Sequence, residues 1–412
     1  MAATLFVGVS ELVMPHLQEG ATREPLDVVR DAALLVDSGR IRAAGPRADV
    51  LPRALGAVCV DLDGRAVLPG LVDSHTHVVF AGDRVDELWR RARGETYETI
   101  ARAGGGIARS AALLAAASVD ELVRESLPRV RTMVARGTTT LEVKSGYGLV
   151  PEQEHKHLAA IMRLAEAAPA SVLATVLAHV IPAAERHDRA AFVTRFIREV
   201  LEPAAARGGV IFADVFVETG AFTADEARLI AARARELGLL LKLHVDQLRE
   251  GGGAELAAEL GALSADHLEH TSPTGRVALA RAGTVATILP GCRFFLGHGP
   301  WPDGRALREA GCEVAVATDC NPGTSMVTDL GLCATLAATQ CGLTLDEALW
   351  AVTRGGARAL GLDDRGTLRE GERADFVVVD HADWRAFFYT PGSPPVHSVR
   401  VAGREVASAS PR

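Results

Sequence analysis

The chain has 412 residues and a formal net charge of −8, and 48% of its residues are hydrophobic. This length exceeds one ordinary domain and suits a large barrel with a smaller module and a sizeable apolar core. The charge is spread along the chain without a basic block, which argues against a nucleic-acid or membrane-surface partner. The six cysteines form no CxxC pair, and neither a basic-plus-apolar leader nor a long uncharged apolar run occurs. We therefore expect a cytoplasmic protein with reduced thiols and no membrane span.

Two kinds of sequence pattern follow one another along the chain. Up to residue 67 the sequence predicts short strands separated by turns, at residues 4–9, 32–37, 41–45 and 57–62. Beyond it, apolar runs alternate with longer amphipathic stretches, which is typical of βα units and a parallel sheet. Helices are predicted at residues 119–136, 151–167, 325–339 and 345–360. Eight apolar runs, the number that closes a barrel, are predicted as strands at residues 71–77, 138–143, 171–179, 210–217, 239–245, 264–268, 284–289 and 313–318.

Strands return after residue 362, at residues 366–368, 374–379 and 397–401, ahead of a C-terminus expected to be frayed. The two β-rich chain ends are expected to pair into one small sandwich-like domain, residues 1–67 and 363–412. The prediction is therefore an α/β fold in which a (β/α)8 barrel of TIM type, residues 68–362, is inserted into this composite β domain.

Polar residues end several of the barrel runs. His75 and His77 close the first run, and alternate side chains of an extended segment point the same way, so both imidazoles can face one point. His244 ends the fifth run, His267 the sixth, and Asp319 follows the eighth. A single polar residue at a strand end is usually just solvated. Four runs that deliver such groups to the rim where barrel active sites lie indicate a metal site.

Three further histidines can be placed by position. His155 and His157 repeat the His-x-His spacing within the predicted helix 151–167, where they face apart, and both are expected at the surface. His179 ends the third run and belongs to the rim.

This arrangement of histidines and aspartate resembles the amidohydrolase superfamily. Binuclear members of that superfamily bridge two metals with a carboxylated lysine, commonly on the fourth strand. The run 210–217 has no lysine, and Lys144 follows the second run, in the wrong place for that bridge. The resemblance therefore implies one metal ion per subunit, zinc with iron as the alternative.

Within the superfamily the chain resembles the imidazolonepropionase family, on stretches that include KSGYG at residues 144–148 and DCNPG at residues 319–323. The resemblance implies metal-dependent hydrolysis of the cyclic amide C–N bond of 4-imidazolone-5-propanoate to N-formimidoyl-L-glutamate, the third step of L-histidine degradation. It also implies a small-molecule substrate and a homodimer.

The same resemblance implies roles for particular residues. We expect Asp319 and His267 to carry the proton transfers, because Gln247 stands where some family members have glutamate and a glutamine cannot act as a base. The planar guanidinium of Arg84 suits the carboxylate of the propionate tail. The expected metal ligands are His75, His77, His244 and Asp319, and the expected substrate contacts are Arg84, Tyr147, His179, Gln247, Asn321, Gly323 and Thr324.

Two alternatives stay open at this point. An aminohydrolase acting on a purine-, pyrimidine- or triazine-like ring would share the metal ligands and differ in tail-binding residues such as Arg84 and Tyr147. A non-catalytic scaffold of the same fold would bind no metal.

Overall fold

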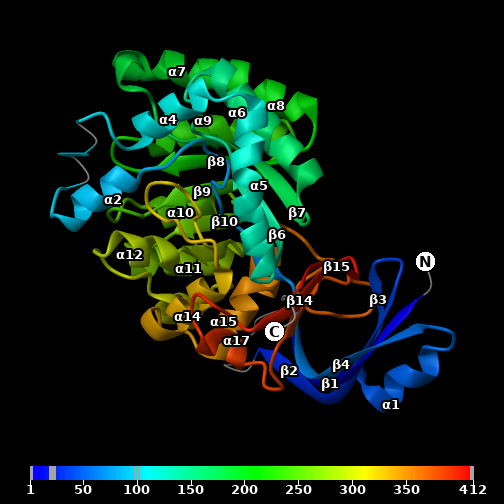
Figure 1. The fold of residues 1–412 in the computed structure, drawn as a ribbon. Coiled ribbons are helices and arrows are strands. Elements are labelled where there is room, and N and C mark those ends of the chain that lie inside the picture. Colours follow the sequence, from blue (N-terminus) through cyan, green and yellow to red (C-terminus); the bar gives the residue numbers. More distant parts are fainter. Residues whose placement is uncertain (1–2, 18–24, 97–98, 101–102, 409–412) are drawn as a thin grey trace.

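The computed structural model describes residues 3–17, 25–96, 99–100 and 103–408, and the statements below concern these residues. Their strands form one eight-stranded and one seven-stranded sheet, which lie in separate parts of the molecule (Figure 1). Within this described part no helix is both long and apolar enough to cross a membrane.

The eight-stranded sheet is an all-parallel barrel whose strands follow one another in chain order. Most of its residues are buried, as expected for parallel strands covered by helices on the outside and packed side chains within. Its strands are β5 (Leu71–Asp73), β6 (Thr138–Lys144), β7 (Ser171–Ala178), β8 (Val210–Val217), β9 (Leu240–Val245), β10 (Ser264–His267), β11 (Val285–Ile288) and β12 (Val314–Val316).

The barrel closes beyond the ends of its first and last strands. The Asp319 amide donates to the His75 carbonyl at 3.0 Å, and the His77 amide donates to the Cys320 carbonyl at 3.0 Å. The segment with the His-x-His pair is thus bonded through its backbone to the segment with Asp319. Barrel closure places these polar side chains next to each other.

The predicted first and eighth strands, residues 71–77 and 313–318, extend beyond the C-terminal ends of β5 and β12. Those predicted C-terminal ends were therefore wrong. The Asp73 carboxylate accepts hydrogen bonds from the Thr318 amide at 3.0 Å and from its hydroxyl at 2.7 Å. Because a side chain takes the place of a backbone acceptor there, the regular ladder stops and the histidine segment runs on as an irregular rim.

Helices surround the barrel (Figure 1). The predicted helix 345–360 is two helices, because Thr353 has a non-helical backbone (φ −121°, ψ −90°). The predicted helix 325–339 starts later, at Leu330, where the Asp329 side chain caps the first turn. The α-helices are α1 (Arg47–Val50), α2 (Val85–Ala92), α4 (Ile107–Ala116), α5 (Val119–Ala135), α6 (Pro151–Ala167), α7 (Arg189–Phe196), α8 (Glu202–Arg207), α9 (Ala224–Glu236), α10 (Gly253–Glu259), α11 (Pro273–Ala282), α12 (Pro290–Leu296), α13 (Gly304–Glu309), α14 (Leu330–Gln340), α15 (Leu345–Val352), α16 (Arg354–Ala359) and α17 (Ala386–Tyr389), with short 3-10 or π segments at Leu51–Arg53, Ala183–Asp188 and Ile197–Leu201.

A glycine lets α16 pack directly on the first barrel strand. A Cβ added to Gly356 would lie 2.2 Å from the Val72 carbonyl oxygen, which is backbone and cannot turn aside. Gly356→Ala is expected to lower the free energy of unfolding by about 1–3 kcal/mol, the usual cost of overpacking, although alanine is otherwise the better helix former. Urea unfolding would measure this.

The matched control is Gly251→Ala. A Cβ at Gly251 would meet nothing nearer than 3.8 Å, and its φ is not in the left-handed region. The control should unfold like the unmodified protein. An unchanged free energy of unfolding in Gly356→Ala would show that α16 can move away from β5 without cost.

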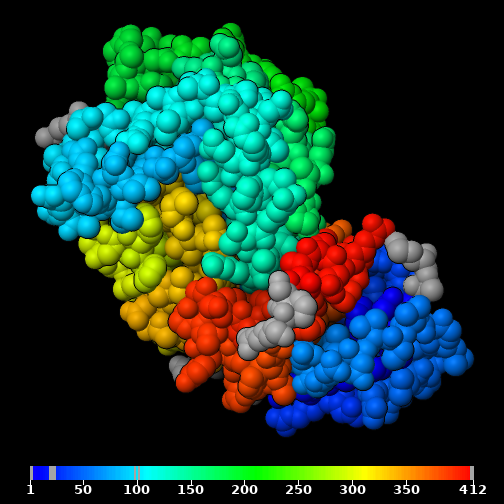
Figure 2. Space-filling view, in the orientation of Figure 1, coloured from blue at the N-terminus to red at the C-terminus, as the bar shows by residue number. Residues whose placement is uncertain are grey.

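The second sheet joins the two chain ends. β4 pairs in parallel with β1 and antiparallel with β13, so an N-terminal and a C-terminal strand are neighbours. Figure 2 shows the N-terminal residues in blue beside the C-terminal residues in red, to one side of the barrel. The strand order is β15 (Arg404–Ser408), β14 (Val396–Val401), β13 (Phe376–Val379), β4 (Val58–Pro69), β1 (Thr4–Pro15), β2 (Leu26–Asp37) and β3 (Arg40–Pro46).

This sheet has a core to which both ends contribute, including Phe6, Ile41 and Phe376. Two predictions for the C-terminal part were wrong. Residues 366–368 form no strand, and the expected frayed end contains β15, while residues 409–412 lie outside the described residues. The domain limits 67/68 and 362/363 stay predictions.

Candidate active site

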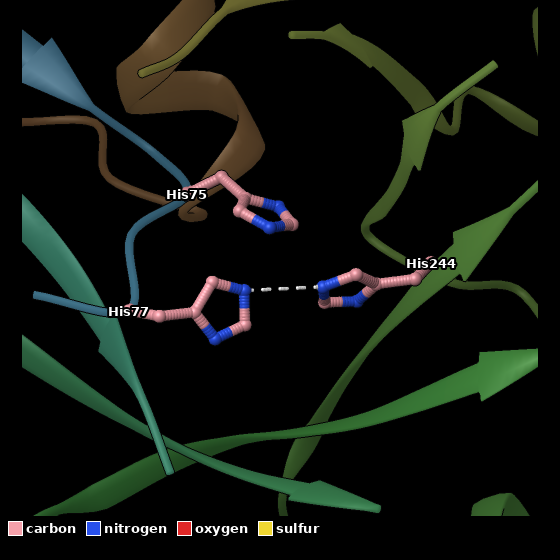
Figure 3. A group of neighbouring side chains, drawn as sticks. All are labelled: His75, His77 and His244. Carbon is pink, nitrogen blue, oxygen red and sulfur yellow. Dashed lines mark hydrogen bonds between the residues drawn. The ribbon is translucent and has the colours of Figure 1, made fainter. Parts of the chain in front are cut away.

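Three imidazoles meet at the C-terminal rim of the barrel. One ring nitrogen from each of His75, His77 and His244 lies within 4.8 Å of the others. Figure 3 shows His75 and His77 reaching from one segment toward His244, and the Nε2 atoms of His77 and His244 are 3.5 Å apart. Burial, reinforced by nearby charged groups, holds the pKa of each imidazole well below its ordinary value. The rings are therefore neutral, the form that binds metals.

Asp319 completes this cluster. Its Oδ1 lies 3.7 Å from His75 Nε2 and 3.6 Å from His77 Nε2. Burial raises the pKa of Asp319 to about 6. His75 Nε2 is buried and has no hydrogen-bond partner within the described part of the chain, as expected for a nitrogen that faces a metal. Three imidazoles and one carboxylate are a donor set that fits a zinc or iron ion.

Two carboxylates that the sequence analysis missed hold the far side of these rings. Asp266 Oδ2 lies 2.7 Å from His75 Nδ1, and Asp214 Oδ2 lies 3.0 Å from His244 Nδ1. A carboxylate that accepts the Nδ1 hydrogen fixes the ring and leaves Nε2 free to bind a metal, as is usual for metal-ligating histidines. The signal in the sequence was present, since both aspartates stand inside apolar strands.

A buried charged layer lies beside these aspartates. Lys144 Nζ lies 2.7 Å from Glu142 Oε1 and 2.7 Å from Asp214 Oδ2. Lys242 Nζ lies 3.4 Å from Glu142 Oε2 and 3.7 Å from Asp266 Oδ2. Burial alone would lower the pKa of Lys144, but the surrounding carboxylates raise it. Glu142 and Lys144, at alternate positions of the buried strand β6, and Lys242, inside the buried strand β9, were the available sign of this layer.

His267 joins the rim beside the cluster. Its ring centroid lies 5.7 Å from that of His75 and 5.5 Å from that of His244. Its backbone has a φ of +88°, which turns the chain at the end of β10. His267 Nδ1 lies 3.5 Å from Glu269 Oε1. Burial alone would lower the pKa of His267, and the Glu269 carboxylate raises it.

Gln247 is linked to the same region through its backbone. Arg293 donates from Nη2 to the Gln247 carbonyl at 2.6 Å. Its Nε donates to Glu269 Oε1 at 3.1 Å. Arg293 and Glu269, neither of which was predicted, therefore connect the Gln247 backbone to His267.

Aromatic side chains line another side of the cluster. The His179 ring stacks on His77 with centroids 5.9 Å apart and planes at 20°, and the Tyr147 centroid is also 5.9 Å from that of His77. Burial lowers the pKa of His179 to about 4. His179 also borders a small pocket lined mostly by apolar side chains, including Phe192, Phe196 and Phe222. The pocket adjoins the site without including the three clustered histidines.

The prediction that His157 is a surface residue was wrong. The side chain is fully buried, and its Nε2 lies 2.9 Å from the Val79 carbonyl. Its ring stacks on Tyr147 with centroids 5.9 Å apart. His157 lies on the inward face of α6 together with buried Leu158 and Ile161, whereas His155 is partly exposed.

Arg84 meets the loop after β12. A Cβ added to Gly323 would lie 2.1 Å from Arg84 Nη1, so only a glycine allows this close approach. Arg84 Nη2 donates to Glu87 Oε2 at 2.6 Å, and Arg91 Nη1 donates to the Gly323 carbonyl at 2.8 Å. Both ends of α2, with Arg84 at its N-cap and Arg91 in its last turn, thereby lie against this loop.

Asn321 orders the loop itself. Its Oδ1 accepts from the Gly323 amide at 2.8 Å and from the Thr324 amide at 2.7 Å. The Thr324 hydroxyl lies 3.5 Å from Asp319 Oδ2. The structure therefore brings the predicted loop residues next to both Arg84 and the Asp319 carboxylate, and Asn321 already accepts hydrogen bonds from these two amides.

Comparisons with known proteins place the chain in a family. Residues 58–393 match the model of the amidohydrolase family. The imidazolonepropionase of Mesorhizobium japonicum is 46% identical over 376 residues, which cover 90% of this chain and 92% of that protein. The imidazolonepropionase of Deinococcus radiodurans is 45% identical over 408 residues, 98% of this chain and 100% of that protein.

Solved structures share the fold at lower identity. A triazine hydrolase variant has a TM-score of 0.78 at 18% identity and covers 99% of this chain and 95% of its own. A 5-methylcytosine deaminase from Klebsiella pneumoniae has a TM-score of 0.73 at 17% identity, with 99% of both chains covered. These likenesses concern the fold alone. Because the family model spans most of the chain and relatives share about 45% of their residues along nearly all of it, the protein belongs to the amidohydrolase family and, within it, to the imidazolonepropionases.

Proposed function

We propose that the protein hydrolyses the cyclic amide C–N bond of 4-imidazolone-5-propanoate to N-formimidoyl-L-glutamate in L-histidine degradation. The observation that carries this proposal is that Gly323, in the loop that follows Asp319, packs against the Arg84 guanidinium. Hydrolysis of a ring amide needs an activated water, which we propose forms at Asp319, and the propionate tail needs a cation, which we propose is Arg84. The contact at Gly323 would bring these two groups close together. We further propose that the enzyme acts on this small molecule as a homodimer in the cytoplasm, as the family resemblance implies.

His75, His77, His244 and Asp319 are the residues that we propose hold one metal ion, zinc with iron as the alternative. When bound, such an ion supplies a water of lowered pKa, near ~7, and a Lewis acid for the carbonyl. The neutral imidazoles support this assignment, as does His75 Nε2, which has no hydrogen-bond partner among the described residues.

The proposed proton transfers use two side chains. Asp319 takes a proton from the attacking water while the water oxygen bonds to the ring carbonyl carbon. His267, held by Glu269, donates a hydrogen bond to the carbonyl oxygen. The C–N bond then breaks, and the proton passes from Asp319 to the departing ring nitrogen, which remains in the formimidoyl group.

Substrate binding is proposed for the surrounding residues. Arg84 pairs with the tail carboxylate through its planar guanidinium. Beside it, Asn321, Gly323 and Thr324 shape the tail site, and the Asn321 side chain already holds the two loop amides. The ring is contacted by Tyr147, His179 and Gln247.

Turnover before and after metal removal tests the function. Freshly prepared imidazolonepropionate should lose its ring absorbance in the presence of the enzyme. A chelator should lower the rate by at least about 100-fold, since the metal supplies the activated water, and zinc added back should restore it. A blank without enzyme corrects for spontaneous decay of the substrate.

Two outcomes would contradict the proposal. Metal binding without turnover would favour the aminohydrolase alternative, which acts on a ring without the tail. Neither metal nor turnover would favour the non-catalytic scaffold.

A further inference from the structure

A buried lysine links the proposed metal site to the neighbouring strand β6. Lys144 Nζ lies 2.7 Å from Asp214 Oδ2, and the same oxygen lies 3.0 Å from His244 Nδ1. On its other side Lys144 donates to Glu142 Oε1 at 2.7 Å. The side chains of Lys144, Asp214 and Glu142 are all fully buried. One ammonium group thus holds the carboxylate that holds a proposed metal ligand.

The choice of lysine at this position is informative. The chain has only three lysines, Lys144, Lys156 and Lys242, although lysine and arginine together number 44. Two of the three lie in this buried charged layer. An arginine would bring five N–H donors in a rigid fork, whereas an ammonium is compact and has three. Apart from Lys156, every other basic residue of the chain outside this layer is an arginine, which suggests that this enclosed space suits a compact cation.

The neighbouring Lys242 has a different set of contacts. Its shortest contact is to the Ser74 carbonyl at 3.0 Å, and it also reaches the Ala359 carbonyl at 3.4 Å. Lys242 therefore braces the backbone before the His-x-His pair. The direct contact to the carboxylate partner of His244 comes from Lys144.

The backbone of Lys144 has a separate task. Its amide donates to the carbonyl of Thr76, the residue between His75 and His77, at 2.9 Å. A side-chain substitution keeps this hydrogen bond. Variants at position 144 therefore remove only the side-chain contacts, which are to Asp214 and Glu142 at 2.7 Å each and to Asp266 at 3.7 Å. The Asp214 variants described below isolate the contact with Asp214.

We propose that Lys144 is a positioning residue for metal binding, which acts through Asp214 to hold His244 with its Nε2 toward His75 and His77. This inference rests on the proposed metal site. Loss of an outer partner of a metal-ligating histidine typically weakens metal affinity by about 10–100-fold. We expect an effect of that size from Lys144→Met.

The experiment measures the zinc dissociation constant of the purified enzyme by competition with a chromophoric chelator. Lys144→Met should bind zinc about 10–100-fold more weakly. The matched control is Lys156→Met, because Lys156 lies on α6 and donates to the Ala115 and Ala117 carbonyls, away from the rim. The control should keep the zinc affinity of the unmodified enzyme. An unchanged zinc affinity in Lys144→Met would overturn the inference.

Two further variants, Lys144→Met/Asp214→Asn and Asp214→Asn, distinguish the positioning of His244 from the effect of an unpaired buried charge on stability. Lys144→Met/Asp214→Asn removes one buried cation and one buried anion together, so it should regain most of the unfolding free energy lost in Lys144→Met. Its zinc affinity should stay low and match that of Asp214→Asn alone, because Lys144 acts through Asp214. Zinc binding by the double variant as tight as in the unmodified enzyme would overturn the inference, even if Lys144→Met fails to fold.

The failure of this inference is distinguishable from failure of the proposed function. An unmodified enzyme that binds no zinc, or whose zinc affinity is unaffected by His75→Ala, would refute the metal site and the inference with it. An unmodified enzyme that binds zinc through His75, together with an unaffected Lys144→Met variant, would refute only the role of Lys144.

Discussion

Asp319→Asn is expected to lower kcat for imidazolonepropionate by about 10²–10⁴-fold, the usual contribution of a general base. The carboxylate Oδ1 lies within 3.7 Å of the Nε2 atoms of His75 and His77, and a neutral amide there neither takes a proton nor binds a metal as strongly. Asparagine is the right replacement because Asp319 has a φ of +53°, which asparagine adopts more readily than alanine. Steady-state kinetics and metal analysis of the same sample measure the effect.

The control for this variant is Asp329→Asn. Asp329 is also a buried aspartate, but it caps α14, and its Oδ1 accepts from the Leu332 amide at 3.1 Å. Asparagine caps a helix about as well, so kcat should stay within about twofold. If Asp319→Asn kept more than about a tenth of the kcat, Asp319 would not be the base.

The barrel could be predicted because its strands are short apolar runs between amphipathic stretches. The run 210–217 coincides with β8, and the other runs overlap their strands. The ends of the first and last strands could not be predicted, since they depend on the Asp73 side chain taking the hydrogen bonds of Thr318, 245 residues away. Only closure of the barrel brings this pair together.

The rim residues could be predicted from the ends of the strands. The contacts of the buried carboxylates beneath these residues could not. Asp266 holds His75 across a separation of 191 residues. The sequence shows a charged residue within an apolar strand, but which ring that carboxylate reaches depends on strand order and on which residues point inward. His157 shows the same limit, because helical spacing separates it from His155 without saying which of the two faces the barrel.

Arg84→Met is expected to lower kcat/KM for imidazolonepropionate by about 100-fold, or about 2.7 kcal/mol, mainly through KM. The proposed tail contact is a charge-assisted hydrogen bond, and methionine keeps the apolar stem without the charge. A ring substrate that lacks the carboxylate should be turned over equally well by both enzymes. Steady-state kinetics with both substrates measure the effect.

The Arg84→Met variant also removes the cation that pairs with a buried carboxylate. The effect of this loss on the fold must be distinguished from the effect on substrate binding. Arg84 donates to Glu87 Oε2 at 2.6 Å, while Glu87 Oε1 accepts from the Gly106 amide at 3.0 Å. Burial alone would raise the pKa of Glu87, but the Arg84 guanidinium holds this pKa below its ordinary value. Arg84→Met would thus leave a buried charge without its cation, which can disturb the fold for reasons unrelated to the tail.

Glu87→Gln resolves this, because glutamine can still accept from Gly106 and carries no charge. Glu87→Gln alone keeps the guanidinium and should change KM by no more than about fivefold, whereas Arg84→Met/Glu87→Gln should show the full loss of about 100-fold. A double variant with the KM of the unmodified enzyme would mean that Arg84 serves only to neutralise Glu87. The tail would then be bound elsewhere, and the argument for a propionate substrate from this corner of the site would fail.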